Sequence, residues 1–171
     1  MHKLAETARE MALKSYHGYV CGTESNLDEI IAPFPGWTKH EADGLWCAAF
    51  VYYCCRQAGY SFSIRPVDGL SCNLAGCIAW EEWARADERL AYILPDTPSI
   101  GDIVLFDRVF DGSEHDHMGI VVAVSDNAIT VAEGNFNNVS TLVDRKRDDH
   151  IRCCIRLPEI LCESEMCSIW N

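Results

Sequence analysis

The chain has 171 residues, the size of one globular domain, and its 49% hydrophobic and 23% charged residues are typical of a protein with an ordinary apolar core. A formal net charge of −12 argues against nucleic acids and anionic membranes, which are partners that need clustered Lys and Arg. No apolar run is long enough to cross a bilayer, so we expect no membrane insertion.

Residues 1–6 lack the apolar region of a signal peptide, so we expect synthesis in the cytoplasm and, for any export, another route. The ten cysteines are then expected to be reduced rather than joined in a disulfide framework. Cys72 and Cys77 have four residues between them, as in some zinc sites. Five positions along a helix turn through about 500°, however, which would put these thiols on different faces. We therefore expect no metal ion and no cofactor.

Residues 3–17 are predicted to form a surface helix, because apolar residues recur there at helical spacing among charged ones. Residues 18–44 are predicted to be irregular, since glycines and prolines recur in them. Such a long loop is a natural wall for a substrate cleft, and Asn26 and Trp37 are its residues best suited to contact a ligand. The alternative for each is a structural role, as a turn residue and as a partly buried aromatic residue.

The segment 45–59 is predicted to be a buried helix that ends at Gly59, because its residues are apolar on almost every side. Cys47 falls in the first turn, where the helix dipole and the unpaired backbone N–H groups favour the reactive thiolate. Cys54 lies two turns further in, where burial is expected to raise the thiol pKa instead. Cys47 is therefore a candidate nucleophile, although this segment alone also fits a small core residue.

Residues 60–69 are next predicted to be an extended connection, 73–87 a second amphipathic helix and 89–94 a short strand. In the second helix, Trp80 and Trp83 share one face, which favours core packing, with a binding platform as the alternative. Apolar, β-rich segments then follow at 103–106, 120–124, 128–132, 139–143 and 151–157. Helices followed by short strands predict an α+β protein, with the N-terminal helices packed on one face of a five- to six-stranded antiparallel sheet.

A cysteine nucleophile needs a base within hydrogen-bond distance and a third group that orients the base. His117 is the candidate base, because it precedes a strand of the sheet on which the Cys47 helix is expected to pack. Glu133 and Asn135 are the candidate orienting residues, since they lie two apart at a strand end, where side chains point the same way. His115 and His117 would also suit a metal ion, but the sequence offers no obvious third ligand.

Four short blocks place these residues in a known order: Trp46-Cys47-Ala48-Ala49-Phe50-Val51, Gly101-Asp102-Ile103-Val104-Leu105-Phe106, His117-Met118-Gly119-Ile120-Val121 and Glu133-Gly134-Asn135. In these blocks the chain resembles the CHAP domains, which are cysteine- and histidine-dependent amidohydrolases and peptidases of the papain-like NlpC/P60 superfamily. The resemblance implies a papain-like fold in which Cys47 is the nucleophile, His117 the base, and Glu133 with Asn135 the orienting residues.

The resemblance also implies a bacterial substrate, the peptidoglycan stem peptide. Its amide bonds would be cut by an N-acetylmuramoyl-L-alanine amidase or a peptide endopeptidase, through a thioester intermediate. Residues 1–157 would form the catalytic domain and 158–171 a short tail of unknown role, and action on the cell wall would follow non-classical export or lysis. The alternatives are a non-catalytic peptide- or protein-binding module on the same fold, or a cysteine amidohydrolase that acts on a protein amide outside the wall.

Two features depart from the pattern of this family. Many CHAP domains have Gln before the nucleophile, where this chain has Trp46, so the second donor to the oxyanion is open. The backbone N–H of Cys47 is one expected donor, and Asn26 is a candidate for the other. The acidic residues before the nucleophile do not reproduce the calcium-binding spacing of some members, so no metal is expected. Trp37, Trp46 and His115 complete the predicted substrate contacts.

Overall fold

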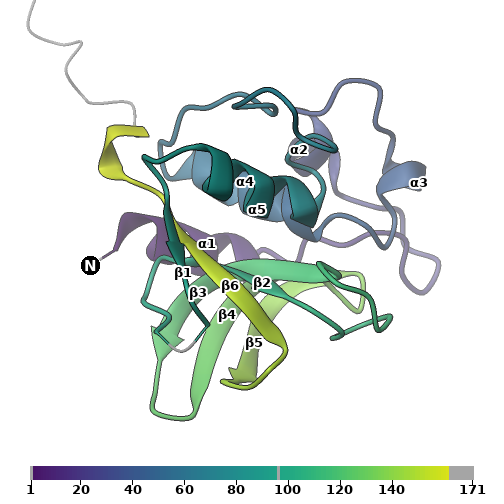
Figure 1. The fold of residues 1–171 in the computed structure, drawn as a ribbon. Helices are drawn as coiled ribbons and strands as arrows, with labels where there is room; N and C mark the ends of the chain where they lie inside the picture. The colour runs from purple at the N-terminus through teal and green to yellow at the C-terminus, as the bar shows by residue number, and fades with distance from the viewer. Residues whose placement is uncertain (1, 96, 162–171) are drawn as a thin grey trace, which may run out of the picture.

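The computed structural model describes residues 2–95 and 97–161, which form a six-stranded antiparallel sheet with helices against it (Figure 1). The strand order is β1–β6–β2–β3–β4–β5, and the strands are β1 (Ala91–Ile93), β2 (Ile103–Phe106), β3 (His117–Val124), β4 (Ala128–Phe136), β5 (Val139–Lys146) and β6 (Ile151–Arg156). The helices are α1 (Lys3–Ala12), α2 (Asp28–Ile31), α3 (Lys39–Ala42), α4 (Cys47–Gln57) and α5 (Cys77–Ala86), followed at the end by the 3₁₀ turn η1 (Glu159–Leu161). The predicted α+β class is confirmed.

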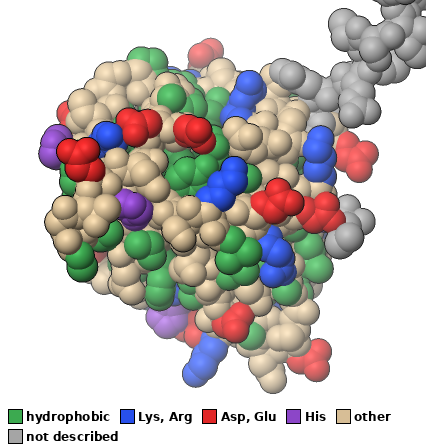
Figure 2. Space-filling view, turned by 180° about the vertical axis from the view of Figure 1, so that it is seen from behind, with side chains coloured by type: hydrophobic (Ala, Val, Ile, Leu, Met, Phe, Trp, Pro, Cys, Tyr) green, Lys and Arg blue, Asp and Glu red, His purple; other side chains and the backbone are tan. Residues whose placement is uncertain are grey.

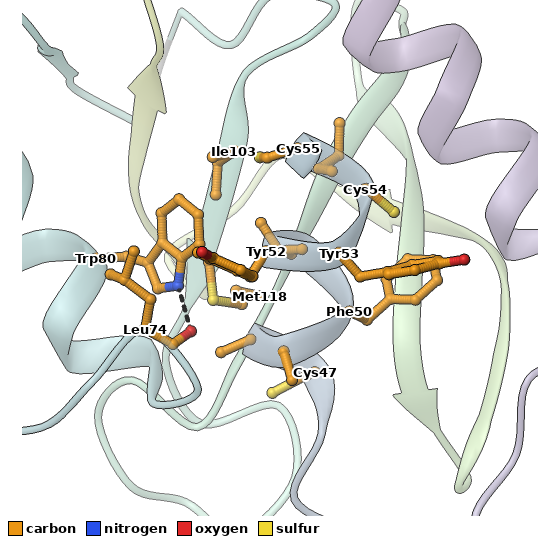
Figure 3. Packing of buried hydrophobic residues seen from close by; sticks show 14 of the residues in the cluster. Cys47, Phe50, Tyr52, Tyr53, Cys54, Cys55, Leu74, Trp80, Ile103 and Met118 are labelled. Atoms are coloured by element: carbon orange, nitrogen blue, oxygen red, sulfur yellow. Dashed lines mark hydrogen bonds between the residues drawn. The ribbon is translucent and has the colours of Figure 1, made fainter. Parts of the chain in front are cut away.

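Helix α4 is the element around which the core is built. Its residues from Cys47 to Cys55 are all buried, and it packs against α1 and against strands β3 and β4. It ends where the sequence predicts, because Gly59 adopts a left-handed φ of +92° and donates its N–H to the Arg56 carbonyl at 3.0 Å. Figure 3 shows its side chains leaving in several directions, with Cys47 at the start of the helix.

Helix α1 ends at Ala12 rather than at residue 17, so the longer predicted helix is wrong at its C-terminal end. Ser15 has a left-handed φ of 55°, and the chain then runs beside β5. The Tyr16 carbonyl accepts from the Ser140 N–H at 2.7 Å, and the Tyr16 N–H donates to the Ser140 hydroxyl at 2.9 Å. Hydrogen bonds to the sheet therefore replace the last turn of the predicted helix.

Helix α5 begins at Cys77, later than the predicted start at residue 73. Asn73 forms a turn instead, in which its side chain accepts from the Ala75 N–H at 2.9 Å and its carbonyl from the Gly76 N–H at 3.0 Å. Gly76 then has extended backbone angles, with φ −107° and ψ 137°. This late start makes Cys77 the first residue of a helix.

Helix α4 approaches the sheet closely at Gly134 of β4. A Cβ atom there would lie 2.4 Å from the Cβ of Phe50 and 2.8 Å from the ring of Trp46. Gly119 of β3 allows a similar approach within the sheet, because its Cβ would lie 2.8 Å from the Ala132 carbonyl oxygen. The missing side chain at residue 134 thus lets the start of α4 lie directly on the strand that carries Glu133.

We expect Gly134→Ala to lower the free energy of unfolding by roughly 1–3 kcal/mol, because the new methyl group overlaps two fully buried aromatic side chains, Phe50 and Trp46. Urea denaturation followed by tryptophan fluorescence measures the change. A variant as stable as the parent would show that α4 can move away from β4 at little cost.

The described chain ends against the helical side of the molecule. The Leu161 carbonyl of η1 accepts from the Ser61 N–H at 2.8 Å. Cys162, Cys167 and Trp170 of the predicted tail lie outside the described residues. On the face shown in Figure 2, Lys and Arg are interspersed with Asp and Glu. None of the described helices is long and apolar enough to cross a membrane.

Candidate active site

The thiol of Cys47 lies at the start of α4, where Cys47 is the first helical residue. Backbone N–H groups of a first helical turn have no partner within the helix, so they are available to a negative charge beside this thiol. The residue is 7% exposed and lines a cleft of about 400 Å³. The residue is therefore largely buried from solvent but can be reached from the cleft.

The histidine predicted as the base lies beside this thiol. His117 is the first residue of β3 and is fully buried. Its Nε2 donates to Oε2 of Glu133 at 2.8 Å, and its buried Nδ1 makes no hydrogen bond within the described residues. The ring and the Cys47 thiol each shift the pKa of the other, and because Glu133 holds Nε2, Nδ1 is the ring nitrogen left for the sulfur. The structure thus places the Cys47 thiol in the electrostatic neighbourhood of an imidazole that Glu133 orients.

The electrostatics of this trio favour a thiolate–imidazolium pair. The pKa of Cys47 is held well below its usual range, first by a hydrogen bond from Cys77 at 3.6 Å and then by His117, although burial opposes the shift. Burial also disfavours the imidazolium, but the interactions with Cys47 and Glu133 outweigh it and raise the pKa of His117 to about 9. Between these two pKa values the sulfur is negative and the ring is positive.

Glu133 has a second partner, Arg145 of β5, which the sequence analysis missed. Arg145 donates through Nε to Oε1 and through Nη2 to Oε2, both at 2.8 Å. Glu133 is fully buried, which alone would raise its pKa, but the hydrogen bonds from Arg145 and His117 lower it below the usual value. The guanidinium also lies over the Phe106 ring, 5.2 Å from its centre. The carboxylate is therefore held ionised inside the fold.

The sequence predicts that Asn135 orients His117 together with Glu133, but the structure gives Asn135 a different partner. The β4–β5 pairing shifts register between Glu133 and Phe136, and Asn135 has a left-handed φ of 64°. The regular alternation assumed for residues 133 and 135 therefore does not hold. Asn135 donates through Nδ2 to the Gly44 carbonyl at 2.7 Å and lines the cleft. Its hydrogen bond thus holds the loop that precedes the nucleophile.

Trp46, which the sequence predicts to contact substrate, has a fully buried side chain in the structure. Its indole N–H donates to Oδ1 of Asn138 at 2.9 Å, and the same oxygen accepts from the Gly44 N–H at 3.2 Å. Asn138 also donates to Asp43 at 2.7 Å. Trp46 therefore anchors the start of α4 to the turn between β4 and β5.

Asn26, another predicted contact and the candidate second oxyanion donor, is not among the residues that line the cleft, and its side chain is hydrogen-bonded elsewhere. Its Oδ1 accepts from the His17 N–H at 2.7 Å, and its Nδ2 donates to the Ser15 carbonyl at 3.3 Å. The structure therefore uses Asn26 to close a turn after α1.

Two further predicted contacts, Trp37 and His115, do line the cleft. Trp37 is half-buried, and His115 is held by a hydrogen bond between its Nε2 and the buried carboxylate of Glu81. Leu45, which the sequence analysis did not single out, is 65% exposed and lines the same cleft. The cleft thus presents apolar and polar side chains together.

The two histidines predicted as possible metal ligands are both occupied by carboxylates, His117 by Glu133 and His115 by Glu81. In the part of the chain that the structure describes, the only group of three ligand-type side chains within 4.8 Å is Asp148, Asp149 and His150, in the turn after β5. The residues around Cys47 are therefore arranged for acid–base chemistry by side chains.

A comparison with protein-family models matches residues 38–135 to the CHAP domain. The match covers more than half of the chain and includes Cys47, His117 and Glu133. The chain belongs to the CHAP domain family. CHAP domains are generally cysteine- and histidine-dependent amidases or peptidases of peptidoglycan. A search of curated proteins found no match to this chain.

The ion pair of this CHAP domain predicts an unusual pH dependence of alkylation. We expect iodoacetamide to modify Cys47 at pH values well below those at which an ordinary thiol ionises, because the pKa of Cys47 is lowered. The rate should rise a second time as the pH passes about 9, because His117 then loses its proton and stops neutralising the thiolate. Timed labelling followed by peptide mass spectrometry gives the rate for each cysteine.

Cys54 is the matched control, since it lies in the same helix but is fully buried, and burial raises its pKa well above the usual value. It should remain unlabelled through both steps. Labelling of Cys47 in a single step, at the pH of an ordinary thiol, would contradict the ion pair.

Proposed function

We propose that this CHAP domain hydrolyses amide bonds of peptidoglycan stem peptides, as an N-acetylmuramoyl-L-alanine amidase or a peptide endopeptidase. The main support is the combination of a Cys47 thiol with a lowered pKa, an imidazole of His117 that contributes to this lowering and is oriented by Glu133, and a cleft beside the thiol. The typical hydrolase activity of the family supports the reaction class. A module that only bound peptides would have no use for a buried, oriented imidazole beside a thiolate.

In this mechanism the Cys47 thiolate attacks the carbonyl carbon of the scissile amide, and backbone N–H groups at the start of α4 stabilise the oxyanion. The His117 imidazolium gives its Nδ1 proton to the leaving amine as the thioester forms. The neutral ring then takes a proton from water, whose oxygen attacks the thioester and releases the sulfur. Glu133 accepts from Nε2–H throughout and keeps Nδ1 directed at the sulfur.

The lining of the cleft supports a peptide substrate. Trp37 and the exposed Leu45 offer apolar surface, while Asn135 and His115 offer polar groups. Such a mixed lining suits stem peptides, which combine backbone amides with short side chains. We also propose that the protein reaches the wall by non-classical export or after lysis.

The test is a digest of purified peptidoglycan by the full chain, followed by mass spectrometry of the released fragments. An amidase frees stem peptides with a new amino terminus on L-alanine, whereas an endopeptidase creates new ends inside the peptide. Either product, formed by the parent but not by protein alkylated at Cys47, supports the proposal. Intact peptidoglycan, treated with protein whose Cys47 still alkylates rapidly, would overturn the wall substrate and favour an amide outside the wall.

A further inference from the structure

The nucleophile has a second thiol as its direct neighbour. The Sγ atoms of Cys47 and Cys77 are 3.6 Å apart, and both residues line the same cleft. Each is the first residue of a helix, Cys47 of α4 and Cys77 of α5. Hydrolysis of an amide by Cys47, His117 and Glu133 requires no second sulfur. The proposed function therefore gives no role to the Cys77 thiol.

We propose that Cys47 and Cys77 form an oxidative modification site, in which a peroxide converts the two thiols into a reversible disulfide and blocks the nucleophile. This inference concerns the reactivity of the two sulfurs, and it does not depend on which bond the CHAP domain cuts.

The chemistry takes place in two balanced steps. The Cys47 thiolate attacks one oxygen of the peroxide, which forms a sulfenic acid and releases hydroxide or alkoxide. The Cys77 thiol then attacks the sulfenic sulfur, the S–S bond forms, and water leaves. The two sulfurs together lose two electrons, and the peroxide gains them. A small thiol reductant reverses the process by exchange.

The environments of the two thiols fit these two roles. Cys47 is the thiolate, because a hydrogen bond from Cys77 and the neighbouring His117 lower its pKa. Cys77 stays protonated while Cys47 is a thiolate, because the Cys47 thiolate, burial and nearby Asp116 raise the pKa of Cys77. The two sulfurs share one proton, so Cys47 is the thiolate that reacts with peroxide and Cys77 is the thiol that can then attack the sulfenic acid.

The geometry allows the bond to form with a small movement. Sulfur atoms in a disulfide are about 2.05 Å apart, so these two must approach by roughly 1.5 Å. Each cysteine directly follows a loop, and the residue before Cys77 is Gly76, whose backbone is extended. The start of α5 is therefore the side on which we expect the adjustment.

The neighbouring cysteines differ in access. Cys54 and Cys153 are fully buried and line no described part of this cleft, so peroxide has no direct route to them. Cys72 is the closest competitor, because it is only partly buried and a Cβ on Gly76 would lie 2.5 Å from its sulfur. The test must therefore separate Cys72 from Cys77 as the partner of Cys47.

The experiment treats the reduced full chain with one equivalent of hydrogen peroxide and then maps its peptides by mass spectrometry. We expect a linked Cys47–Cys77 peptide that lacks two hydrogen atoms, and loss of iodoacetamide labelling at Cys47. Dithiothreitol should restore that labelling in full. The Cys72→Ser variant should behave as the parent does.

Without Cys77 the sulfenic acid has no adjacent thiol, so Cys77→Ser should gain two or three oxygen atoms on Cys47 as peroxide is raised, and dithiothreitol should not restore labelling. Cys77→Ala serves as a second variant, and circular dichroism checks that each is folded. A Cys47–Cys72 link in the parent, or full recovery of labelling in folded Cys77 variants, would overturn the inference. Because labelling is the readout, this result is independent of whether the chain hydrolyses peptidoglycan.

Discussion

Cys47→Ala should reduce release of stem peptides from purified peptidoglycan by about 10⁴- to 10⁶-fold, the range for loss of a catalytic nucleophile. The remaining groups can still bind substrate and donate hydrogen bonds, but no thioester forms. The loss of stability should be small, about 1 kcal/mol, because only one sulfur atom is removed at the edge of a cleft. Fragment release measured by mass spectrometry and urea unfolding measure the two effects separately.

The matched control is Cys54→Ala, which removes the same atom from the same helix, two turns away from the cleft. Cys54 is fully buried and its pKa is raised, so we expect the variant to keep its activity while it loses about 1–2 kcal/mol of stability. Activity that survived in Cys47→Ala but fell in Cys54→Ala would refute the assignment of the nucleophile.

The main features of α4 could be predicted because they depend on local sequence. Its apolar residues and Gly59 define a buried helix with a definite end, and Cys47 occupies its first turn in the sequence as in the structure. The α+β arrangement likewise follows from a short-range pattern, in which helical spacing changes to short, apolar, β-rich segments after residue 100.

Arg145 could not be predicted because its role depends on strand pairing. The predicted strand 139–143 stops two residues before it, whereas β5 continues to Lys146 and pairs Arg145 with Ile129. Residues 129 and 133 lie on one face of β4, so a long side chain at 145 can reach along that face to Glu133. A longer predicted strand would have raised this possibility.

The contact between the Cys47 and Cys77 thiols could not be predicted from the sequence for a related reason. It depends on where α5 begins, and a turn at Asn73 delays that beginning to Cys77. The positions of the Asn26 and Trp46 side chains could not be predicted for another reason, since hydrogen bonds with other residues decide where a polar or aromatic side chain points. The spacing of apolar residues along the sequence gives no information about such hydrogen-bond partners.

Arg145→Met should lower the free energy of unfolding by about 3–5 kcal/mol, because it removes the guanidinium that pairs with the fully buried Glu133 carboxylate and leaves only His117 beside it. Hydrolysis should fall by about 10²-fold, since a carboxyl that is protonated or displaced no longer orients His117. The stability deficit should shrink at low pH, because a stranded Glu133 has a raised pKa and loses its charge as the pH falls through that value. Urea unfolding at several pH values measures this trend.

The double variant Glu133→Gln/Arg145→Met tests whether the stability lost in Arg145→Met comes from the charge of Glu133. With no carboxylate left at residue 133, it should recover most of the stability lost in Arg145→Met, yet its activity should remain low because the imidazolium has lost its anionic partner. Arg145→Lys keeps the positive charge but not the two parallel hydrogen bonds, so we expect intermediate stability and reduced turnover. If the double variant were no more stable than Arg145→Met, the loss of stability would come from lost packing of the Arg145 side chain on the Phe106 ring. The contact of Arg145 with this ring, rather than its charge, would then stabilise the fold.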